Sequence, residues 1–364
     1  MPGKGDAFVK KEKAQKGGSW KVVLTTILCI LLALVLAIVA VGSAFANYLL
    51  SKIDRVQMGQ EPTISPSQVE DMLNTDPDLT PVDPSESLPD IGDITFPSED
   101  PEPVGQGGHV INILLIGQDT ESGAVRARSD SMILMTLNTK AGTVTFTSFM
   151  RDAYVQIPGY KPNKLNHAYQ YGGMKLLNET LKVNFGVEVD GDVEVNFAQF
   201  ESIIDLLGGV DIDLTEEEAA YMCLGPGKEW DLKPGVNRLN GEQALSYARI
   251  REIDSDYHRT LRQRTLLTAL TNAYKNQPID QLLPLLEEIL GLITTNMTDA
   301  QIWDCAFNLI PMLSGLQVRS DRIPADGTFR QGSVQVRPGL KGWFQYDIDF
   351  EANRQRLQRI MDEE

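Results

Sequence analysis

The first long hydrophobic stretch of the chain runs from Val22 to Leu50 and contains no charged residue. Because about 20 consecutive apolar residues are enough for a helix to span a bilayer, this stretch predicts a transmembrane helix. Residues 1–21 carry several lysines, whereas acidic residues soon follow the stretch. Positive charge stays on the cytoplasmic side of a membrane, so we expect a basic cytoplasmic tail and an extracellular remainder. Ala44-Phe45-Ala46 resembles a signal-peptidase site, but the apolar stretch exceeds the ~7–15 residues of a signal-peptide core, which favours an uncleaved anchor.

Proline and acidic side chains dominate residues 51–108. Nine of the 19 prolines lie between Pro62 and Pro103, and the stretch from Asp54 to Glu102 contains thirteen acidic residues and one arginine. Such a composition cannot bury enough apolar surface to become ordered. The pattern predicts a disordered, extended linker that holds the next domain away from the membrane.

From residue 109 to 364, apolar runs of strand length alternate with apolar positions of helical period. This alternation is typical of an α/β domain, so we expect a central mixed sheet flanked by helices in three layers. Strands are predicted over Val110–Ile116, Met132–Leu137, Thr143–Phe149, Val210–Leu214, Gln317–Arg322 and Gly332–Arg337. Helices are predicted over Met174–Val183 (opened by Gly172-Gly173), Phe197–Leu207, Gly241–Ala248, Thr260–Asn276, Gln281–Ile293, Asp299–Leu313 and after Asp349.

The composition of the whole chain narrows the classes of function. Hydrophobic residues make up 42%, which suffices for a sizeable core. A formal net charge of −17 argues against nucleic acid as a partner, since phosphate backbones are bound by clustered positive charge. Three histidines, and three cysteines without a CxxC spacing, argue against a zinc or His-rich centre. Cys223 and Cys305 lie outside the cell under the predicted topology, where we expect a disulfide; two separate buried thiols are the alternative.

Charged residues gather where three predicted strands meet their loops. Asp119 follows the first strand, Arg128 and Asp130 precede the second, and Arg151 and Asp152 end the third. Open α/β sheets bind ligands at the carboxyl ends of their strands. A turn or a surface salt bridge would explain any one of these residues, but three such junctions together indicate a shared site.

Arginine, without lysine, is concentrated between Val236 and Tyr274. If the predicted helix ends near Ala248, the chain beyond it is extended, and Arg249 and Arg251 face the same way. Guanidinium groups fork onto planar or multi-oxygen anions, so a diphosphate ligand would explain this choice of residue.

Arg259, Arg262 and Gln263 on the next helix have the i, i+3, i+4 spacing of one helix face. A solvated, salt-bridged face is the alternative interpretation. Asp119 and Asp130 could hold a Mg²⁺ between their carboxylates and the oxygens of a diphosphate. Together these patterns predict a magnesium and diphosphate site.

The motifs that carry these residues resemble the LytR–CpsA–Psr family, which attaches glycopolymers to the bacterial cell wall. The resemblance covers roughly residues 112–276 and departs from the family pattern at Met150, where a proline is usual, and at His258, where a glycine is common. It rests on Asn112–Asp119, Arg128–Ser131, Ser148–Asp152, Lys164–Tyr169 with Gly172-Gly173, Asp205–Val210, Leu239–Arg251 and Arg262-Gln263.

The resemblance implies a phosphotransferase of the bacterial cell membrane, with an extracellular catalytic domain over residues 109–364. Its donor would be a polyprenyl-diphosphate-linked glycan, such as a teichoic acid or capsule precursor. Its acceptor would be a hydroxyl of peptidoglycan, typically the 6-hydroxyl of N-acetylmuramic acid. A diphosphate hydrolase with the same site residues, and a non-enzymatic wall-binding or regulatory membrane protein, are the alternatives.

The resemblance also implies roles for individual residues. Asp119 and Asp130 match the ligands of Mg²⁺, for which Mn²⁺ could substitute. We expect Asp119, Arg151 and Arg249 to act in catalysis, with Asp119 taking the proton of the acceptor. The expected diphosphate contacts are Arg128, Arg151, Arg249, Arg251, Arg262 and Gln263. The expected lining of a lipid groove, for which ordinary core is the alternative, is Leu206, Leu207, Leu266, Leu267 and Leu270.

Overall fold

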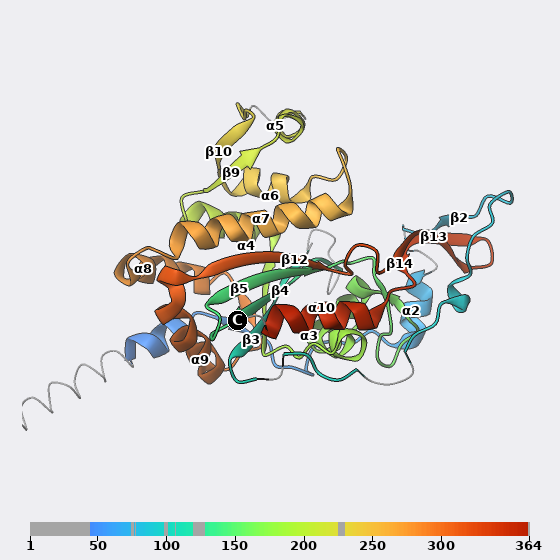
Figure 1. Cartoon of the computed structure of the whole chain (residues 1–364), viewed down its shortest axis with the longest axis horizontal. Coiled ribbons are helices and arrows are strands. Elements are labelled where there is room, and N and C mark those ends of the chain that lie inside the picture. Colours follow the sequence, from blue (N-terminus) through green and yellow to red (C-terminus); the bar gives the residue numbers. More distant parts are fainter. Residues whose placement is uncertain are drawn as a thin grey trace, which may run out of the picture. The chain divides into compact units, whose positions relative to one another are not determined.

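The computed structural model describes residues 44–73, 76, 78–97, 101–105, 107–118, 128–224 and 230–362 (Figure 1). The chain forms two compact units, Met1–Lys52 and Ile53–Glu364. Residues 44–50 of the first unit are helical, and residues 22–43 of the predicted transmembrane segment lie outside the described residues. Among the residues that are described, no helix has both the length and the apolar character needed to cross a membrane.

The second unit is built on a seven-stranded sheet in the order β1-β11-β8-β3-β4-β5-β12. The pairs β3–β4, β4–β5 and β11–β8 are antiparallel, whereas β3–β8, β5–β12 and β1–β11 are parallel. The predicted central mixed sheet is therefore confirmed. Its strands are β1 (Asp54–Arg55), β3 (Val110–Gln118), β4 (Ser129–Asn138), β5 (Thr143–Phe149), β8 (Gly191–Asn196), β11 (Thr294–Thr295) and β12 (Gln317–Ile323).

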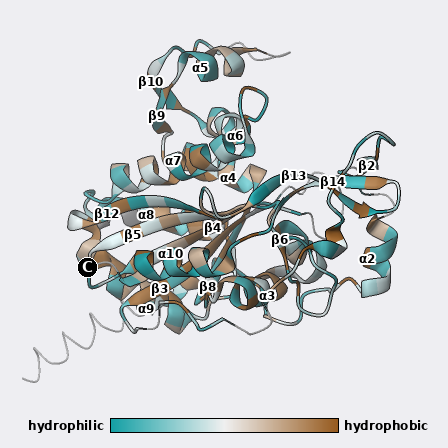
Figure 2. Ribbon diagram, turned by 45° about the vertical axis from the view of Figure 1, so that its right-hand side comes forward, coloured by the Kyte–Doolittle hydropathy of each residue, from teal (hydrophilic) through white to brown (hydrophobic). Residues whose placement is uncertain are grey.

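Helices cover both faces of this sheet. Successive side chains of a strand point to opposite faces, so each central strand contributes side chains to two cores. On β3, Leu114 packs in one core with α3 (Leu165–Phe185) and α10 (Phe350–Asp362). Ile113 points the other way, into a second core with α7 (Asp256–Tyr274), α9 (Asp299–Leu309) and the 3-10 helix η2 (Ile310–Gly315). Hydrophobic residues accordingly concentrate in the central strands (Figure 2).

A small lobe with its own core is inserted between β8 and α7. Its core contains Ile204, Ile212 and Met222, which come from three different elements. Leu266 of α7 belongs to this core and the adjacent Leu267 packs against the sheet, so α7 joins the two. The lobe consists of α4 (Phe197–Leu206), β9 (Val210–Leu214), α5 (Glu216–Cys223), β10 (Gly235–Leu239) and α6 (Gly241–Arg249), and α8 (Ile279–Leu290) follows α7.

The described part of residues 53–108 differs from the predicted disordered linker. It contains β1, α2 (Pro66–Leu73), β2 (Thr80–Pro81) and η1 (Ile91–Asp93), and Val69 and Val104 are buried in the core beside α3. β2 pairs with β14 (Leu340–Tyr346), which pairs in turn with β13 (Arg330–Arg337). Ile53, Val69 and Val104 of this stretch need no core of their own, because they are buried within the domain.

Two further expectations change with the structure. Cys223 and Cys305 are both free thiols, so the predicted disulfide is wrong. Cys223 lies in the lobe, where its Sγ donates to the Trp230 carbonyl at 3.0 Å, whereas Cys305 packs against the core beneath α9. The two cysteines therefore lie in different parts of the domain and have different neighbours.

The helix predicted over Met174–Val183 begins earlier, at Leu165, directly after the β6 (Tyr154–Val155) and β7 (Asn163–Lys164) pair. Gly172 and Gly173 form a kink inside α3 instead of its start. Gly173 has a φ of +67°, and a Cβ there would lie 2.0 Å from a carboxylate oxygen of Glu61. Only glycine fits this bend, which brings the segment before α2 against α3.

Asp192 on β8 is fully buried. Its Oδ2 accepts hydrogen bonds from Asn178 and Asn296, but its Oδ1 has no partner among the described residues. Burial raises the pKa of Asp192 to about 7 from an ordinary value of 3.8, although the two asparagine hydrogen bonds oppose this shift.

Asp192 should therefore make stability depend on pH. Because its pKa is higher in the folded chain, its contribution is fully present below pH 3.8 and is lost as pH rises through about 7. From about pH 5 to about pH 8, we expect the wild-type free energy of unfolding to fall by on the order of 3 kcal/mol more than that of Asp192→Asn. Urea denaturation at the two pH values measures the difference, and parallel profiles would contradict it.

Candidate active site

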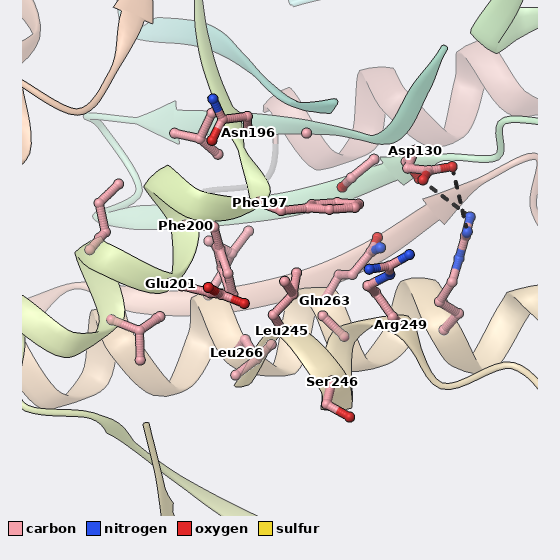
Figure 3. A pocket seen from close by; sticks show the side chains of 18 of the residues that line it. Asp130, Asn196, Phe197, Phe200, Glu201, Leu245, Ser246, Arg249, Gln263 and Leu266 are labelled. Atoms are coloured by element: carbon pink, nitrogen blue, oxygen red, sulfur yellow. Dashed lines mark hydrogen bonds and ion pairs between the residues drawn. The ribbon is translucent and has the colours of Figure 1, made fainter. Parts of the chain in front are cut away.

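A cavity of about 710 Å³ lies between the sheet and the lobe (Figure 3). Leu115, Ile133 and Val193 line it from β3, β4 and β8, and side chains of α4, α6 and α7 line it from the other side. Asn196 and Asn240 begin α4 and α6 with capping boxes, which fix where these helices start. The cavity is therefore framed by elements whose ends are determined locally by sequence.

Close packing of α6 on α4 positions the first functional arginine. A Cβ on Gly241 would lie 2.2 Å from the Glu201 carbonyl oxygen, so only glycine allows this approach. At the other end of α6, the Arg249 guanidinium lies over the Phe197 ring of α4, 4.4 Å from its centroid. The chain is extended at Ile250, as the sequence predicts, and both Arg249 and Arg251 line the cavity.

One end of the cavity is polar. Figure 3 shows the side chains of Arg249 and Gln263 close together on the side where Asp130 lies. Gln263 Oε1 is buried and has no hydrogen-bond partner among the described residues. A buried amide without a partner is costly unless a ligand completes it. Arg251 and Arg259 also line the cavity, so this end offers guanidinium and amide groups to an anion.

The other end of the cavity is mainly apolar, although the Glu201 side chain also lies there (Figure 3). Phe200, Leu245 and Leu266 lie toward the side away from Asp130 in Figure 3. Of the leucines expected in a lipid groove, Leu266, Leu267 and Leu270 line the cavity, whereas Leu206 and Leu207 do not. The cavity thus joins an apolar region to a cluster of anion-binding groups.

Asp256 at the start of α7 holds three arginines at the polar end. Its Oδ1 lies 2.9 Å from Arg259 Nη2, 3.6 Å from Arg251 Nη2 and 3.7 Å from Arg151 Nε. Burial raises the pKa of Asp256, although Arg259 and Arg151 lower it. Burial lowers the pKa of Arg259, and the positive charge of Arg151 lowers it further. The negative charge of Asp256 thereby offsets the repulsion among these three guanidinium groups.

Arg151 reaches the site through Asp130 instead of lining the cavity. Its Nη1 donates to Asp130 Oδ1 at 3.0 Å, and Arg259 Nη2 donates to the Asp130 backbone carbonyl at 3.3 Å. Burial is the largest influence on Arg151, but Asp152, Asp256 and Asp130 outweigh it and raise its pKa. Of the residues predicted for the site, the structure brings together Asp130, Arg151, Arg249, Arg251 and Gln263.

Three predicted site residues are placed differently. Asp119 lies outside the described residues. Arg128 lines a second, smaller cavity, where it forms ion pairs with Asp76 and Asp78. Arg262 does not line the large cavity, because it is buried against Glu218, to which its Nε donates at 2.7 Å.

Arg259 also belongs to the site, although no role for it could be predicted from the sequence alone. Arg259 and Gln263 are four residues apart and face the cavity together. Consecutive helical residues point about 100° apart, so Arg262 and Gln263 cannot both face one narrow site. Helical spacing is the signal in the sequence that pairs Arg259, rather than Arg262, with Gln263.

Mg²⁺ is the metal that the sequence leads us to expect. Among the described residues, no three metal-ligating side chains gather at one place. Asp130 nevertheless suits the ion, because carboxylate oxygens are its preferred ligands. Its side chain is 32% exposed, and its ion pairs with Arg151 and Arg259 both involve Oδ1. Asp130 could therefore hold Mg²⁺ through Oδ2, with Asp119 as the second ligand expected from the sequence.

Two characterised proteins have sequences similar to that of this chain. The polyisoprenyl-teichoic acid–peptidoglycan teichoic acid transferase TagT of Bacillus subtilis is 32% identical over 216 residues, which cover 58% of this chain and 66%, just under two thirds, of TagT. The regulatory protein MsrR of Staphylococcus aureus is 30% identical over 256 residues, covering 70% of this chain and 75% of MsrR.

Solved structures show the same fold. TagT bound to LIIa-WTA matches with a TM-score of 0.56 and 27% identity over 76% of this chain and 99% of that one. TagT with bound octaprenyl pyrophosphate lipid matches with a TM-score of 0.53 and 25% identity over 77% of this chain and 99% of that one. The model of the LytR_cpsA_psr family matches residues 92–337, which is more than half of the chain, and the protein therefore belongs to that family.

Proposed function

We propose that this protein transfers a glycopolymer, with its attached phosphate, from a polyprenyl-diphosphate carrier to a hydroxyl of peptidoglycan. The observation that carries the proposal is one cavity that joins an apolar region to arginine and glutamine side chains. An amphiphile with a hydrocarbon tail and a diphosphate head matches both ends. The names of TagT, and the octaprenyl pyrophosphate in one of its structures, support the same class of ligand.

In the proposed complex, Arg249, Arg251 and Gln263 hold the diphosphate while the tail lies along the apolar end. Charge-assisted hydrogen bonds from guanidinium groups position the two phosphates and offset their charge. Arg259 and Asp256 keep the neighbouring arginines in place. Mg²⁺ held by Asp130 and Asp119 would neutralise part of the diphosphate charge when bound.

The reaction is a substitution at the phosphorus next to the sugar. The oxygen of the acceptor hydroxyl forms a bond to this phosphorus, and the bond to the oxygen bridging the two phosphates breaks. Polyprenyl phosphate leaves with that bridging oxygen, whose developing charge Arg249 and Arg251 stabilise. The acceptor proton passes to a carboxylate, for which we propose Asp119, the residue directly after β3 in the sequence.

The acceptor and the site of action follow from the same proposal. The 6-hydroxyl of N-acetylmuramic acid is the proposed acceptor, and teichoic acid or capsule chains are the proposed cargo. Because peptidoglycan lies outside the cell membrane, residues 109–364 would act there, on a chain anchored by the predicted helix over residues 22–50.

The products of two incubations test the function. The purified protein is given a short polyprenyl-diphosphate-linked glycan, once alone and once with peptidoglycan oligomers, and the products are identified by mass spectrometry. We expect a peptidoglycan–glycan phosphodiester and polyprenyl phosphate only when the oligomers are present. Free glycan phosphate at the same rate in both incubations would show a hydrolase, and unchanged donor in both would show a binding protein.

A further inference from the structure

The smaller cavity contains positive groups that are already occupied by carboxylates of the same chain. It has a volume of about 160 Å³ and is lined by Arg128, His167 and Asp76, among other residues. Asp76 and Asp78 lie between α2 and β2, in the stretch expected to be a linker. We call these two aspartates the acidic plug.

Both aspartates contact cations. Arg128 Nη1 lies 2.5 Å from Asp78 Oδ2 and 3.6 Å from Asp76 Oδ1. Lys164 Nζ lies 3.8 Å from the same Asp78 oxygen, and its side chain is only 7% exposed. Two cations that converge on one carboxylate oxygen form an anion site. A phosphate oxygen would meet the same donors in the same place.

The Asp76 carboxylate is held in its charged form. Burial alone would raise its pKa, but hydrogen bonds from His167 and from the Asp78 backbone N–H, with the charge of Arg128, lower it to about 2. The Nε2–Oδ2 distance to His167 is 3.5 Å, and burial lowers the pKa of His167, so this histidine donates as a neutral ring. Asp76 is therefore anionic at any physiological pH.

The anion site is linked to the large cavity by ion pairs. Lys164 Nζ lies 3.0 Å from Asp152 Oδ1, and Asp152 Oδ2 lies 3.6 Å from Arg151 Nε. Arg151 in turn donates to Asp130, which lines the large cavity. An anion on Arg128 and Lys164 would thus join the same charge network as the ligand of the large cavity.

The two aspartates of the plug differ in exposure, because the Asp76 side chain is only 11% exposed. The Asp78 side chain is 44% exposed, and Val69 is the one residue that α2 buries. A carboxylate offers one negative charge to a guanidinium, whereas the diphosphate of a lipid-linked glycan carries a negative charge and non-bridging acceptor oxygens on both of its phosphates. A substrate phosphate is therefore the stronger ligand for Arg128 once the plug moves aside.

We propose that the acidic plug is a displaceable internal competitor, which fills the anion site of Arg128 and Lys164 until a phosphate group of the lipid-linked substrate replaces it. The identity of that substrate rests on the proposed function, whereas the competition between carboxylate and phosphate does not. Arg128 was expected to contact the diphosphate. While the acidic plug is bound to Arg128, this side chain is not available to the substrate.

Calorimetric titration of the full chain in detergent micelles with inorganic pyrophosphate tests the competition. Removing the two negative charges with Asp76→Asn and Asp78→Asn should tighten pyrophosphate binding about tenfold or more, because like charges next to the site oppose the anion. Adding Arg128→Ala to that double variant should abolish the gain. The single variant Asp78→Asn keeps the contact of Asp76 with His167 and should give a smaller gain in the same direction.

The matched control is Glu70→Gln with Asp71→Asn, which removes two exposed charges from α2 and should leave the affinity unchanged. An equal gain in this control, a gain that survives Arg128→Ala, or no gain in either plug variant would overturn the proposal. Pyrophosphate binding needs no turnover, so a protein that fails to transfer glycan but shows the gain contradicts only the proposed function.

Discussion

Replacing Arg249 by alanine is expected to lower the rate of glycopolymer transfer about 30- to 1000-fold, which corresponds to about 2–4 kcal/mol of lost transition-state stabilisation. Arg249 lines the polar end of the cavity beside Gln263 (Figure 3). Arg249→Lys keeps the charge but loses the fork of donors, so we expect an intermediate rate. Arg251→Ala should be impaired in the same way as Arg249→Ala.

The folded state should survive these substitutions. Arg249 stacks on Phe197, a cation–π contact that at an exposed site contributes about 1 kcal/mol or less to the free energy of unfolding. Thermal unfolding is measured beside the transfer rate, with Arg330→Ala on β13 as the control for loss of an exposed arginine. Wild-type transfer per folded molecule in both Arg249→Ala and Arg251→Ala would mean that this cluster is not the diphosphate site.

Replacing Arg262 by alanine is expected to act on stability instead, lowering the free energy of unfolding by about 3–5 kcal/mol. Arg262 donates to Glu218 Oε1 at 2.7 Å and to the Ile250 carbonyl at 3.2 Å, and it is also paired with Asp254. Glu218 is buried, so truncating Arg262 leaves a buried charge without its partner. Chemical denaturation measures the loss.

A compensating variant makes this prediction sharper. Glu218→Gln removes the charge and keeps an oxygen for the backbone N–H of Thr215, which Glu218 now accepts at 3.0 Å. The double variant Arg262→Met with Glu218→Gln should therefore be more stable than Arg262→Met alone. If Arg262→Ala were as stable as the wild type but slow in transfer, Arg262 would be a ligand contact, as the sequence first indicated.

The sequence predicted an anion site that contains both Arg262 and Gln263, but it did not predict that Arg262 binds Glu218 instead of lining the cavity. Clustered arginines without lysine predicted an anion site, and the structure brings Arg249, Arg251 and Gln263 together at one end of a cavity. Helix spacing groups Arg259 with Gln263, but which face of α7 meets the cavity depends on how the helix is rotated against the lobe. Glu218, distant in sequence, fixes that rotation by binding Arg262.

The strands show a similar contrast. Some could be predicted from their own residues, whereas others form because of the strands they pair with. β3 and β4 could be predicted because their apolar runs are typical of strands buried on both faces, and β5 because it is rich in Thr, Val and Phe, which favour strands. β8, with the sequence GDVEVN, has too few apolar residues for such a prediction and is a strand because β3 and β11 pair with it on either side. The burial of Val69 and Val104 could not be predicted from local sequence either, because it depends on core residues that are distant in the chain.

The most direct test of the central claim follows each phosphate of the donor to its product. A polyprenyl-diphosphate-linked glycan labelled in the phosphate next to the sugar is incubated with the protein and peptidoglycan oligomers. We predict that the label appears in a phosphodiester on peptidoglycan and that the polyprenyl phosphate released is unlabelled. Label that stays on the lipid while the sugar is transferred, or that is released as free glycan phosphate, would contradict phosphotransfer at this site.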